Sequence, residues 1–382
     1  MKRLLWAVEK QFDVATDAST WVEMIRELEK RYQTVLLTGY RNKPVDTLFR
    51  STRCGWYRSA RIPIVNRLVS YFYLVALLMG ELRRNRPDFV ILNGTNPFLV
   101  LAAARARRMG ARVIFDVRTL PVGTSAASRL VENVLLGLCL KLATRVLDGV
   151  SYITEEMEEH CRTAYGLGDH CSTTWSSGVN PDIFQISTSG PVEHAEMTVL
   201  YHGTIACQRR LGTVVEALAL LPQGLVRLRF LGSGDGTEDI RQLIESLGLH
   251  DYVRVDPPIP YERIPEAIAA CDLGIIPLPN WQGWNVSSPI KLFEYLACGK
   301  PVIVTDIPAH RAVLDGMPFA FWAGNGSPPE IAAAMTASIT ARSALPGLGL
   351  AARDFVSQRY TWACQADRLA LFLENLPSAG RG

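Results

Sequence analysis

The residue types best suited to chemistry lie in one stretch, Ser287–Val304, which reads SSPIKLFEYLACGKPVIV. Ser287 and Ser288 are residue types that cap helix N-termini, and Pro289 suits a first helical position. The pattern therefore predicts a helix that begins at these residues and stops at Gly299, followed by a short strand.

The start of this predicted helix is a candidate anion site. Backbone N–H groups without a partner inside the helix and the positive end of the helix dipole both face outward there. One turn deeper, Glu294 offers a carboxylate that can accept hydrogen bonds from the hydroxyls of a ribose. The expected contacts to the anion are Ser287, Ser288, Pro289, Ile290 and Lys291.

A second group of candidates follows the first predicted strand of the second half of the chain. Gly203 and Thr204 end that strand, and Arg209 and Arg210 open the next helix. Gly203 lets a ligand approach the backbone, and the two guanidinium groups can neutralise a diphosphate. Arg209 is the candidate catalytic cation. The structural alternative is a solvated helix start with surface arginines.

Two loops complete the candidate donor site. Gly232 and Gly234 lie in a glycine-rich turn after the second strand of this half. The glycine motif that binds a nicotinamide cofactor would follow the first strand of a domain, so the position of this turn argues against such a cofactor. Asn285 lies in the loop before the helix, between Trp284 and Val286, and can hydrogen-bond a sugar hydroxyl. Alternatively, the tryptophans of this loop serve only to pack it down.

In the first half, the candidates follow strand ends, at the edge where open α/β sheets bind ligands. Asp116 and Arg118 end one strand and are the candidate catalytic pair, with a structural ion pair as the alternative. The expected contacts to an acceptor are Glu9, Lys10, Asn93 and Arg118. The six histidines show no metal-binding spacing, so neither a metal nor a cofactor is expected.

In this order, the motifs resemble those of retaining GT-B glycosyltransferases, a large family that includes bacterial polysaccharide and glycolipid glycosyltransferases. In that family, the donor helix carries one Glu, seven residues and a second Glu, of which the second binds the donor ribose and the first contacts the sugar. Glu294 stands at the second position and Val286 at the first, so only the ribose contact carries over. The family also has a loop with a Gly-Arg pair followed by a Lys, beside the leaving diphosphate. In this chain, Arg209 stands at the position of that Lys and Thr204 at the position of that Arg.

The resemblance also covers Arg145–Ser151 and Ser177–Phe184. It implies two Rossmann-like doubly wound domains facing a central cleft. It also implies metal-independent transfer of a sugar from a nucleotide-diphosphate donor to an acceptor hydroxyl, with retention of configuration, in polysaccharide, glycolipid or glycoconjugate biosynthesis. The alternatives are an epimerase or inverting transferase on the same fold, or a non-catalytic nucleotide-sugar-binding protein.

Short apolar runs alternate with helical patterns along the whole chain, which predicts parallel βαβ units. We expect an acceptor-binding domain over 1–184, a linker over 185–196, a donor-binding domain over 197–360 and a C-terminal helix and tail over 361–382. Strands are expected at 3–8, 34–38, 88–92, 111–115, 145–150, 172–175, 198–201, 226–231, 251–255 and 272–276. Helices are expected at 19–31, 97–109, 154–165, 209–221, 237–247, 261–270 and 362–376, besides the one at Ser287.

The composition and charge of the chain indicate which kinds of partner it can bind. The chain has 382 residues, of which 48% are hydrophobic and 20% charged, so it is not a disordered chain. Its eight cysteines are scattered, which favours reduced thiols in the cytoplasm. Residues 1–120 carry 21 basic and 10 acidic residues. This excess, with the aromatic side chains near residues 56–73, favours an anionic acceptor or an anionic membrane surface, while a core helix after a solvated basic loop is the alternative. No nucleic-acid partner is expected.

Overall fold

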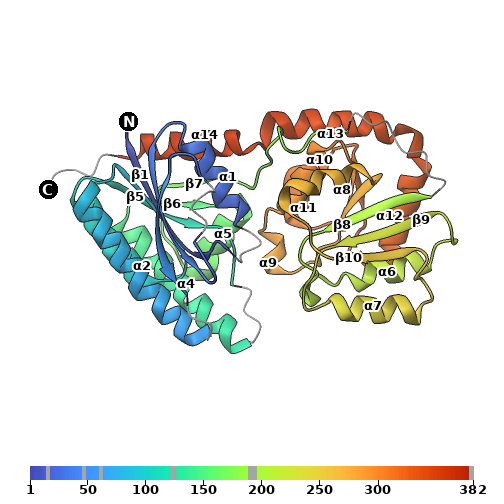
Figure 1. Ribbon diagram of the computed structural model, residues 1–382, viewed down its shortest axis with the longest axis horizontal. Coiled ribbons are helices and arrows are strands. Elements are labelled where there is room, and N and C mark those ends of the chain that lie inside the picture. The colour runs from blue at the N-terminus through green and yellow to red at the C-terminus, as the bar shows by residue number, and fades with distance from the viewer. Residues whose placement is uncertain (14–17, 45–48, 60–62, 122–125, 188–195, 378–382) are drawn as a thin grey trace. The chain divides into compact units, whose positions relative to one another are not determined.

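The structure, a computed structural model, describes residues 1–13, 18–44, 49–59, 63–121, 126–187 and 196–377. Its contacts divide the chain into two compact units. The first unit comprises Met1–Ser176 and Trp362–Gly382, and the second comprises Ser177–Thr361. Each unit is built around one parallel sheet covered by helices (Figure 1).

The boundary between the units falls at Ser176, ahead of residue 184, where the sequence pattern ended the first domain. Residues after Ser176 belong to the second unit because Val179 forms a β-bridge with Thr361 and the Arg353 guanidinium donates to the carbonyl oxygen of Phe184. The chain returns to the first unit at Trp362. Most of the expected linker, 188–195, lies outside the described residues, as does the end of the expected tail.

The first unit contains a seven-stranded parallel sheet in the order β3-β2-β1-β4-β5-β6-β7. The sheet order reverses between β1 and β4, so the carboxyl ends of these two strands mark the switch point where such sheets bind ligands. The strands are β1 (Arg3–Gln11), β2 (Gln33–Tyr40), β3 (Arg53–Arg58), β4 (Phe89–Asn93), β5 (Arg112–Val117), β6 (Gly149–Tyr152) and β7 (Ser172–Thr174).

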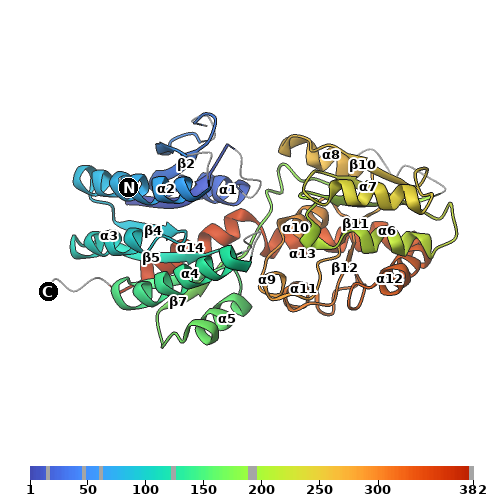
Figure 2. The ribbon, with the colours of Figure 1, turned by 90° about the horizontal axis from the view of Figure 1, so that it is seen from below.

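Helices cover both faces of this sheet. They are α1 (Ser19–Leu28), α2 (Pro63–Asn85), α3 (Pro97–Arg108), α4 (Ala126–Val146), α5 (Glu155–Tyr165) and α14 (Trp362–Asn375). Figure 1 shows α1 and α14 on one face, and Figure 2 shows α2, α3 and α4 side by side on the other. Within the described residues, no helix is long and apolar enough to cross a membrane.

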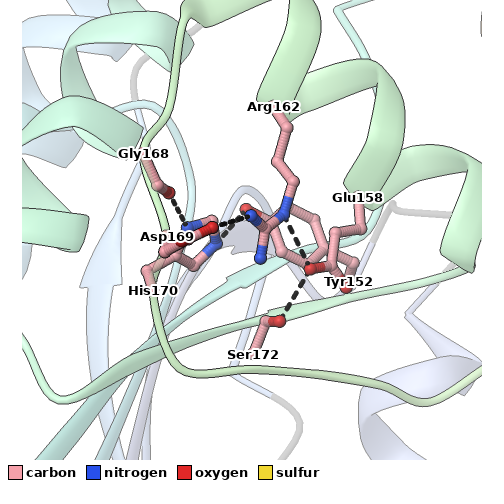
Figure 3. Close-up of polar contacts among 7 residues, drawn as sticks. All are labelled: Tyr152, Glu158, Arg162, Gly168, Asp169, His170 and Ser172. Atoms are coloured by element: carbon pink, nitrogen blue, oxygen red, sulfur yellow. Dashed lines mark hydrogen bonds and ion pairs between the residues drawn. The ribbon is translucent and has the colours of Figure 1, made fainter.

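The short strand β7 is held by polar contacts with α5 (Figure 3). Glu158 accepts hydrogen bonds from the Ser172 hydroxyl at 2.7 Å and from Arg162 Nε at 3.0 Å. His170 Nδ1 lies 2.8 Å from the Gly168 carbonyl oxygen, which can only accept, so Nδ1 carries the proton and Nε2 accepts from the Tyr152 hydroxyl at 3.0 Å. This network therefore fixes the edge of the sheet.

The second unit contains a six-stranded parallel sheet in the order β10-β9-β8-β11-β12-β13, which reverses between β8 and β11. Its strands are β8 (Met197–His202), β9 (Val226–Leu231), β10 (Val253–Asp256), β11 (Leu273–Ile276), β12 (Val302–Val304) and β13 (Ala320–Trp322). Its α-helices are α6 (Gly212–Ala219), α7 (Thr237–Ser246), α8 (Ile264–Ala269), α9 (Gln282–Asn285), α10 (Ile290–Ala297), α11 (Pro308–Leu314), α12 (Pro328–Thr340) and α13 (Leu345–Arg359). In the described part of this unit, 3-10 turns also occur at Cys207–Arg209, Tyr261–Arg263 and Arg342–Ala344.

The helix α10 is buried along nearly its whole length. Its apolar residues, among them Phe293 and Leu296, belong to a core cluster that also contains Val179 and Phe184. Tyr295 packs under β11, where any side chain at Gly274 would collide with its ring. Burial on this scale fixes the position of the two charged residues that α10 carries.

The sequence pattern predicted many of these elements, but it named no helix at α4, α11, α12 or α13 and no strand at β13. Three further features were missed or misplaced. The expected strand at 145–150 was wrong, because α4 continues to Val146 and β6 begins only at Gly149. The edge strand β3 was missed, because its basic, aromatic sequence resembles a loop. The expected helix at 209–221 begins only at Gly212, after a 3-10 turn.

Candidate active site

The carboxyl end of β8 and the first turns of α10 bring together four of the predicted donor residues. Lys291 Nζ lies 4.1 Å from the centroid of the Tyr201 ring, and a Cβ at Gly203 would come within 3.1 Å of that nitrogen. Glu294 Oε2 lies 3.3 Å from His202 Nε2. Arg209 joins the group through Tyr201, and we call these six residues the β8–α10 cluster.

Burial governs the charges in this cluster. It raises the pKa of Glu294 to about 8, although the Lys291 ammonium opposes this shift. It lowers the pKa of His202 well below the usual value, with Lys291 and Arg209 adding to the effect. Near pH 7, both partners of the His202 and Glu294 contact are therefore mostly neutral, so the contact is not an ion pair, and its geometry leaves His202 Nε2 without a hydrogen bond.

Lys291 has no hydrogen-bond partner on Nζ. Its side chain is only 9% exposed, and burial, aided by the positive charge of Arg209, lowers its pKa well below the usual value. The Lys291 amine instead lies over the face of the Tyr201 ring. A buried amine without an acceptor is costly, so this site suits an anion that brings oxygen acceptors.

Arg209 is held over the same loop. Its Nη1 donates to the Tyr201 hydroxyl at 2.8 Å, and that hydroxyl donates to the Thr204 carbonyl oxygen at 2.7 Å. Its guanidinium carbon lies 5.3 Å from the centroid of the Trp284 ring. Arg210 is exposed and adopts a left-handed backbone conformation, with φ of 51°. Among the described residues, no recorded contact joins Arg210 to the cluster.

Gly232 and Gly234 support the loop that carries Gly203. A Cβ on Gly232 would collide with the carbonyl oxygen of Gly203, and one on Gly234 with that of Ile205. Ile205 N donates to the Ser233 carbonyl oxygen at 2.9 Å, and Gly236 N donates to that of Ile205 at 3.0 Å. The glycines are therefore required by the close approach of two loops, whatever ligand binds nearby.

The start of α10 differs from the expectation in its cap. Pro289 is the N-cap and Ile290 the first helical residue, with no side-chain cap bond. Ser287 and Ser288 do not cap the helix, because a local partner engages the hydroxyl of Ser287 and a distant one engages that of Ser288. The Ser287 hydroxyl donates to the Trp284 carbonyl oxygen at 2.8 Å, and the Ser288 oxygen accepts from Ser177 N at 3.1 Å. The first turn of α10 is thus left without a side-chain cap.

The loop before α10 is folded on itself. Trp281 and Trp284 form an edge-to-face pair with centroids 5.9 Å apart. Asn285 Nδ2 donates to Asn280 Oδ1 at 2.7 Å, while Asn285 Oδ1 is buried without a partner. Val286, at the position of the family's first Glu, is 2% exposed. Its apolar side chain therefore offers no hydrogen-bonding group at this position.

In the first unit, Asp116 and Arg118 lie at the carboxyl end of β5. Ser151 Oγ donates to Asp116 Oδ1 at 2.8 Å, and Asn93 Nδ2 donates to the Asp116 carbonyl oxygen at 2.9 Å. Arg118 stacks on Trp175, with its guanidinium carbon 3.4 Å from the ring centroid, and donates to the Trp175 carbonyl oxygen at 2.5 Å. Burial raises the pKa of Asp116 to about 6, against the effect of Arg118.

Glu9 and Lys10 lie at the end of β1. The Glu9 carboxylate accepts hydrogen bonds from Thr95 N at 2.9 Å and from the Ser70 hydroxyl at 3.2 Å. Gly94 has φ of 140°, and a Cβ there would press on Glu9. Lys10 Nζ lies 5.5 Å from the centroid of the Trp21 ring. Glu9 therefore fixes the turn between β4 and α3.

Sequence reasoning did not select His202, Tyr201, Ser151 or Trp175. His202 and Tyr201 immediately precede Gly203, so their position at a strand end was the available signal. Ser151 and Trp175 gave none, because their partners lie on other strands. No group of three or more His, Cys, Asp or Glu side chains that could hold a metal ion occurs in the described part of the chain.

Two parallel α/β units, each with ligand-binding residue types at the carboxyl ends of its strands, form the architecture of the GT-B fold. Sucrose-phosphate synthase from Thermosynechococcus elongatus has a TM-score of 0.79 at 15% identity, covering 98% of this chain and 99% of that one. Anabaena HepE in complex with UDP and glucose has a TM-score of 0.76 at 16% identity, covering 98% of this chain and 100% of that one. These likenesses show the fold.

Sequence comparisons identify the family of the chain. Residues 196–340 match the family "Glycosyl transferases group 1", and residues 18–170 match "Glycosyl transferase 4-like domain". A GDP-mannose-dependent alpha-(1-6)-phosphatidylinositol monomannoside mannosyltransferase of Mycobacterium tuberculosis is 25% identical over 348 residues, covering 87% of each chain. The chain belongs to the group 1 glycosyl transferases, a family of retaining enzymes that use nucleotide-sugar donors.

Proposed function

We propose that the second unit binds the nucleoside diphosphate of the donor at the β8–α10 cluster. The observation that carries this proposal is the buried Lys291 amine, which has no hydrogen-bond partner and lies beside Gly203 near the uncapped start of α10. A diphosphate would supply the acceptors that this amine lacks. It would also accept from the first N–H groups of the helix.

The other residues of the cluster take complementary roles. Arg209 neutralises charge on the leaving diphosphate, and Glu294 binds the ribose hydroxyls. In the retaining reaction, the acceptor hydroxyl attacks from the face that the diphosphate leaves, and its proton passes to the departing phosphate oxygen. Lys291 and Arg209 accelerate this step because they stabilise the charge that develops on that oxygen.

We place the acceptor in the first unit, on the residues around Asp116, Arg118, Glu9, Lys10 and Asn93. A glycan or glycolipid acceptor in cell-surface polysaccharide or glycoconjugate synthesis is supported by the name of the mycobacterial relative, which specifies a phosphatidylinositol monomannoside. The eight free cysteines support a reducing, cytoplasmic compartment.

The test combines binding with product analysis. Thermal unfolding with a panel of nucleotide sugars selects the donor, because a ligand of the native state raises the melting temperature according to its affinity. Glu294→Ala should weaken binding of that donor about tenfold or more, because a buried hydrogen-bonding group is lost. Glu245→Ala, which alters an exposed carboxylate on α7, is the matched control and should change nothing.

The product formed with the selected donor should keep the anomeric configuration of that donor. Equal losses in Glu294→Ala and Glu245→Ala would contradict the ribose assignment. An inverted product would contradict the proposed reaction.

A further inference from the structure

Exposed apolar side chains concentrate on three helices of the first unit. Phe72 on α2 is 72% exposed, Phe98 on α3 is 63% exposed, and Leu130 on α4 is 65% exposed. Folded proteins seldom leave so many large apolar side chains together on one surface without a partner. The others on these helices are Leu68, Tyr73, Leu101, Val131, Val134 and Leu138. We call the outer surface of these helices the α2–α4 face.

These side chains form one band because the helices are neighbours. Figure 2 shows α2, α3 and α4 side by side over the sheet. All three connect strands of a parallel sheet, so they run in the same direction. On each helix, the exposed apolar residues occupy the N-terminal part, up to just past the middle of α4. The band therefore crosses all three helices at one end of the face.

Basic side chains occupy the other end of the same face. Arg83 and Arg84 end α2, Arg105 and Arg108 end α3, and Lys141 and Arg145 lie in the last turns of α4, all of them exposed. The three helices contain only two acidic residues, Glu81 and Glu132. Glu81 is buried and paired with Arg53, and Glu132 accepts from the Ser128 hydroxyl. Among the described side chains of these helices, every fully exposed charged one is thus basic.

We propose that the α2–α4 face docks on an anionic lipid bilayer. An apolar band beside a basic band is the arrangement with which helices lie in a membrane interface, where the apolar side chains enter the acyl boundary and the basic ones meet anionic headgroups. A second copy of this chain fits less well, because a symmetric pair would bring the basic side chains against either basic or apolar ones, with no exposed acid to pair them. The proposal concerns a surface of the first unit alone and needs no donor.

The test is flotation of the full chain with vesicles, in the absence of nucleotide sugar. Phosphatidylcholine vesicles containing phosphatidylglycerol should carry the protein, and pure phosphatidylcholine vesicles should carry much less. Raised ionic strength should release it. The triple variant Phe72→Ser, Phe98→Ser, Leu130→Ser should bind the vesicles at least about tenfold more weakly, because three apolar side chains that would enter the bilayer are lost.

The matched control removes exposed leucines from the second unit, with Leu220→Ser, Leu247→Ser and Leu350→Ser. It should bind the vesicles like the unaltered protein. A charge variant, Arg105→Gln, Arg108→Gln, Arg145→Gln, should also bind anionic vesicles about tenfold more weakly, with no change in its binding to pure phosphatidylcholine vesicles. Circular dichroism melting checks that each variant is folded.

Three results would overturn the proposal. They are no flotation of the unaltered protein on anionic vesicles, an equal loss in the second-unit control, and a dimer in sedimentation analysis that the Phe72, Phe98, Leu130 variant converts to monomer. The last would assign the face to a second copy of the chain. None of these results bears on donor binding.

Discussion

The two units place polar clusters at equivalent positions, the carboxyl ends of their central strands, but satisfy them differently. In the first unit, Arg118 donates to a backbone carbonyl, and Asp116 accepts from Ser151. In the second unit, Lys291 is equally buried, yet its amine has no hydrogen-bond partner. Protein groups thus hold part of each charge of the first cluster, although Asp116 Oδ2 and Arg118 Nε and Nη2 also lack hydrogen-bond partners. The Lys291 amine has no such partner at all, so the second cluster has the greater need for an external anion.

The comparison predicts that removing the buried cation of the first unit harms the free protein most. Arg118→Met leaves Asp116 buried without its compensating charge and frees the Trp175 carbonyl oxygen. It should lower the free energy of unfolding by about 3 kcal/mol, the cost of leaving buried polar and charged groups without compensation. Urea denaturation measures this effect. An unchanged denaturation midpoint would show that the first cluster is not structural.

Removing the buried cation of the second unit should have the opposite profile. Lys291→Met keeps the length of the side chain, and the free energy of unfolding should not fall, because the amine has no hydrogen bond to lose and an apolar group can still pack on the Tyr201 ring. Binding of a nucleoside diphosphate should weaken about hundredfold, since a buried charged contact is lost. Titration calorimetry measures the affinity. Loss of stability without loss of affinity would reverse the assignment of the two clusters.

The pKa of Glu294 predicts a pH dependence of stability in the second unit. Burial raises this pKa from 4.5 to about 8. Between these values, the folded protein holds a proton that the unfolded chain releases, so the free energy of unfolding contributed by this residue falls as pH rises. Glu294→Gln should remove on the order of 2 kcal/mol of that fall.

Denaturation at pH 5 and pH 8 compares Glu294→Gln with the unaltered protein. The lowered pKa of Lys291 acts with opposite sign in both proteins, so the difference between their pH profiles reports on Glu294 together with its coupling to Lys291. Parallel pH profiles would show that Glu294 titrates near its ordinary value.

A smaller difference in stability should separate two reasons for glycine in this unit, a left-handed backbone conformation and the close packing of two loops. Gly248→Ala places a Cβ in open space at φ of 64°, so only backbone strain opposes it. Gly232→Ala adds a collision with the Gly203 carbonyl oxygen. It should cost about 1 kcal/mol more, as expected for forcing two packed loops apart. Equal melting temperatures of the two variants would exclude close loop packing as the reason for Gly232.

Much of this arrangement could be predicted from the sequence because it is local. The alternation of strands and helices, the helix that carries Lys291 and Glu294, and the strand end at Gly203 all follow from short patterns. Partners distant in the chain could not be predicted. Ser177 engages Ser288, so Ser288 does not cap α10, and Pro289 stands at the N-cap position without a side-chain cap bond.

Burial was the other property hidden from the sequence. Glu9 and Arg118 are charged residues at strand ends, which predicted contacts to an acceptor. In the folded chain, Glu9 accepts from Thr95 N and Arg118 donates to Trp175, contacts that depend on how neighbouring strands meet. His202 was overlooked for the same reason, since its contact with Glu294 joins β8 to α10.

The most direct test of the account is a crystal structure of the protein with the nucleoside diphosphate of its preferred donor. We predict phosphate oxygens within hydrogen-bonding distance of Lys291 Nζ and of the first N–H groups of α10, with the ribose hydroxyls on Glu294. A diphosphate bound elsewhere, with the Lys291 amine still without a partner, would contradict the assignment of the β8–α10 cluster.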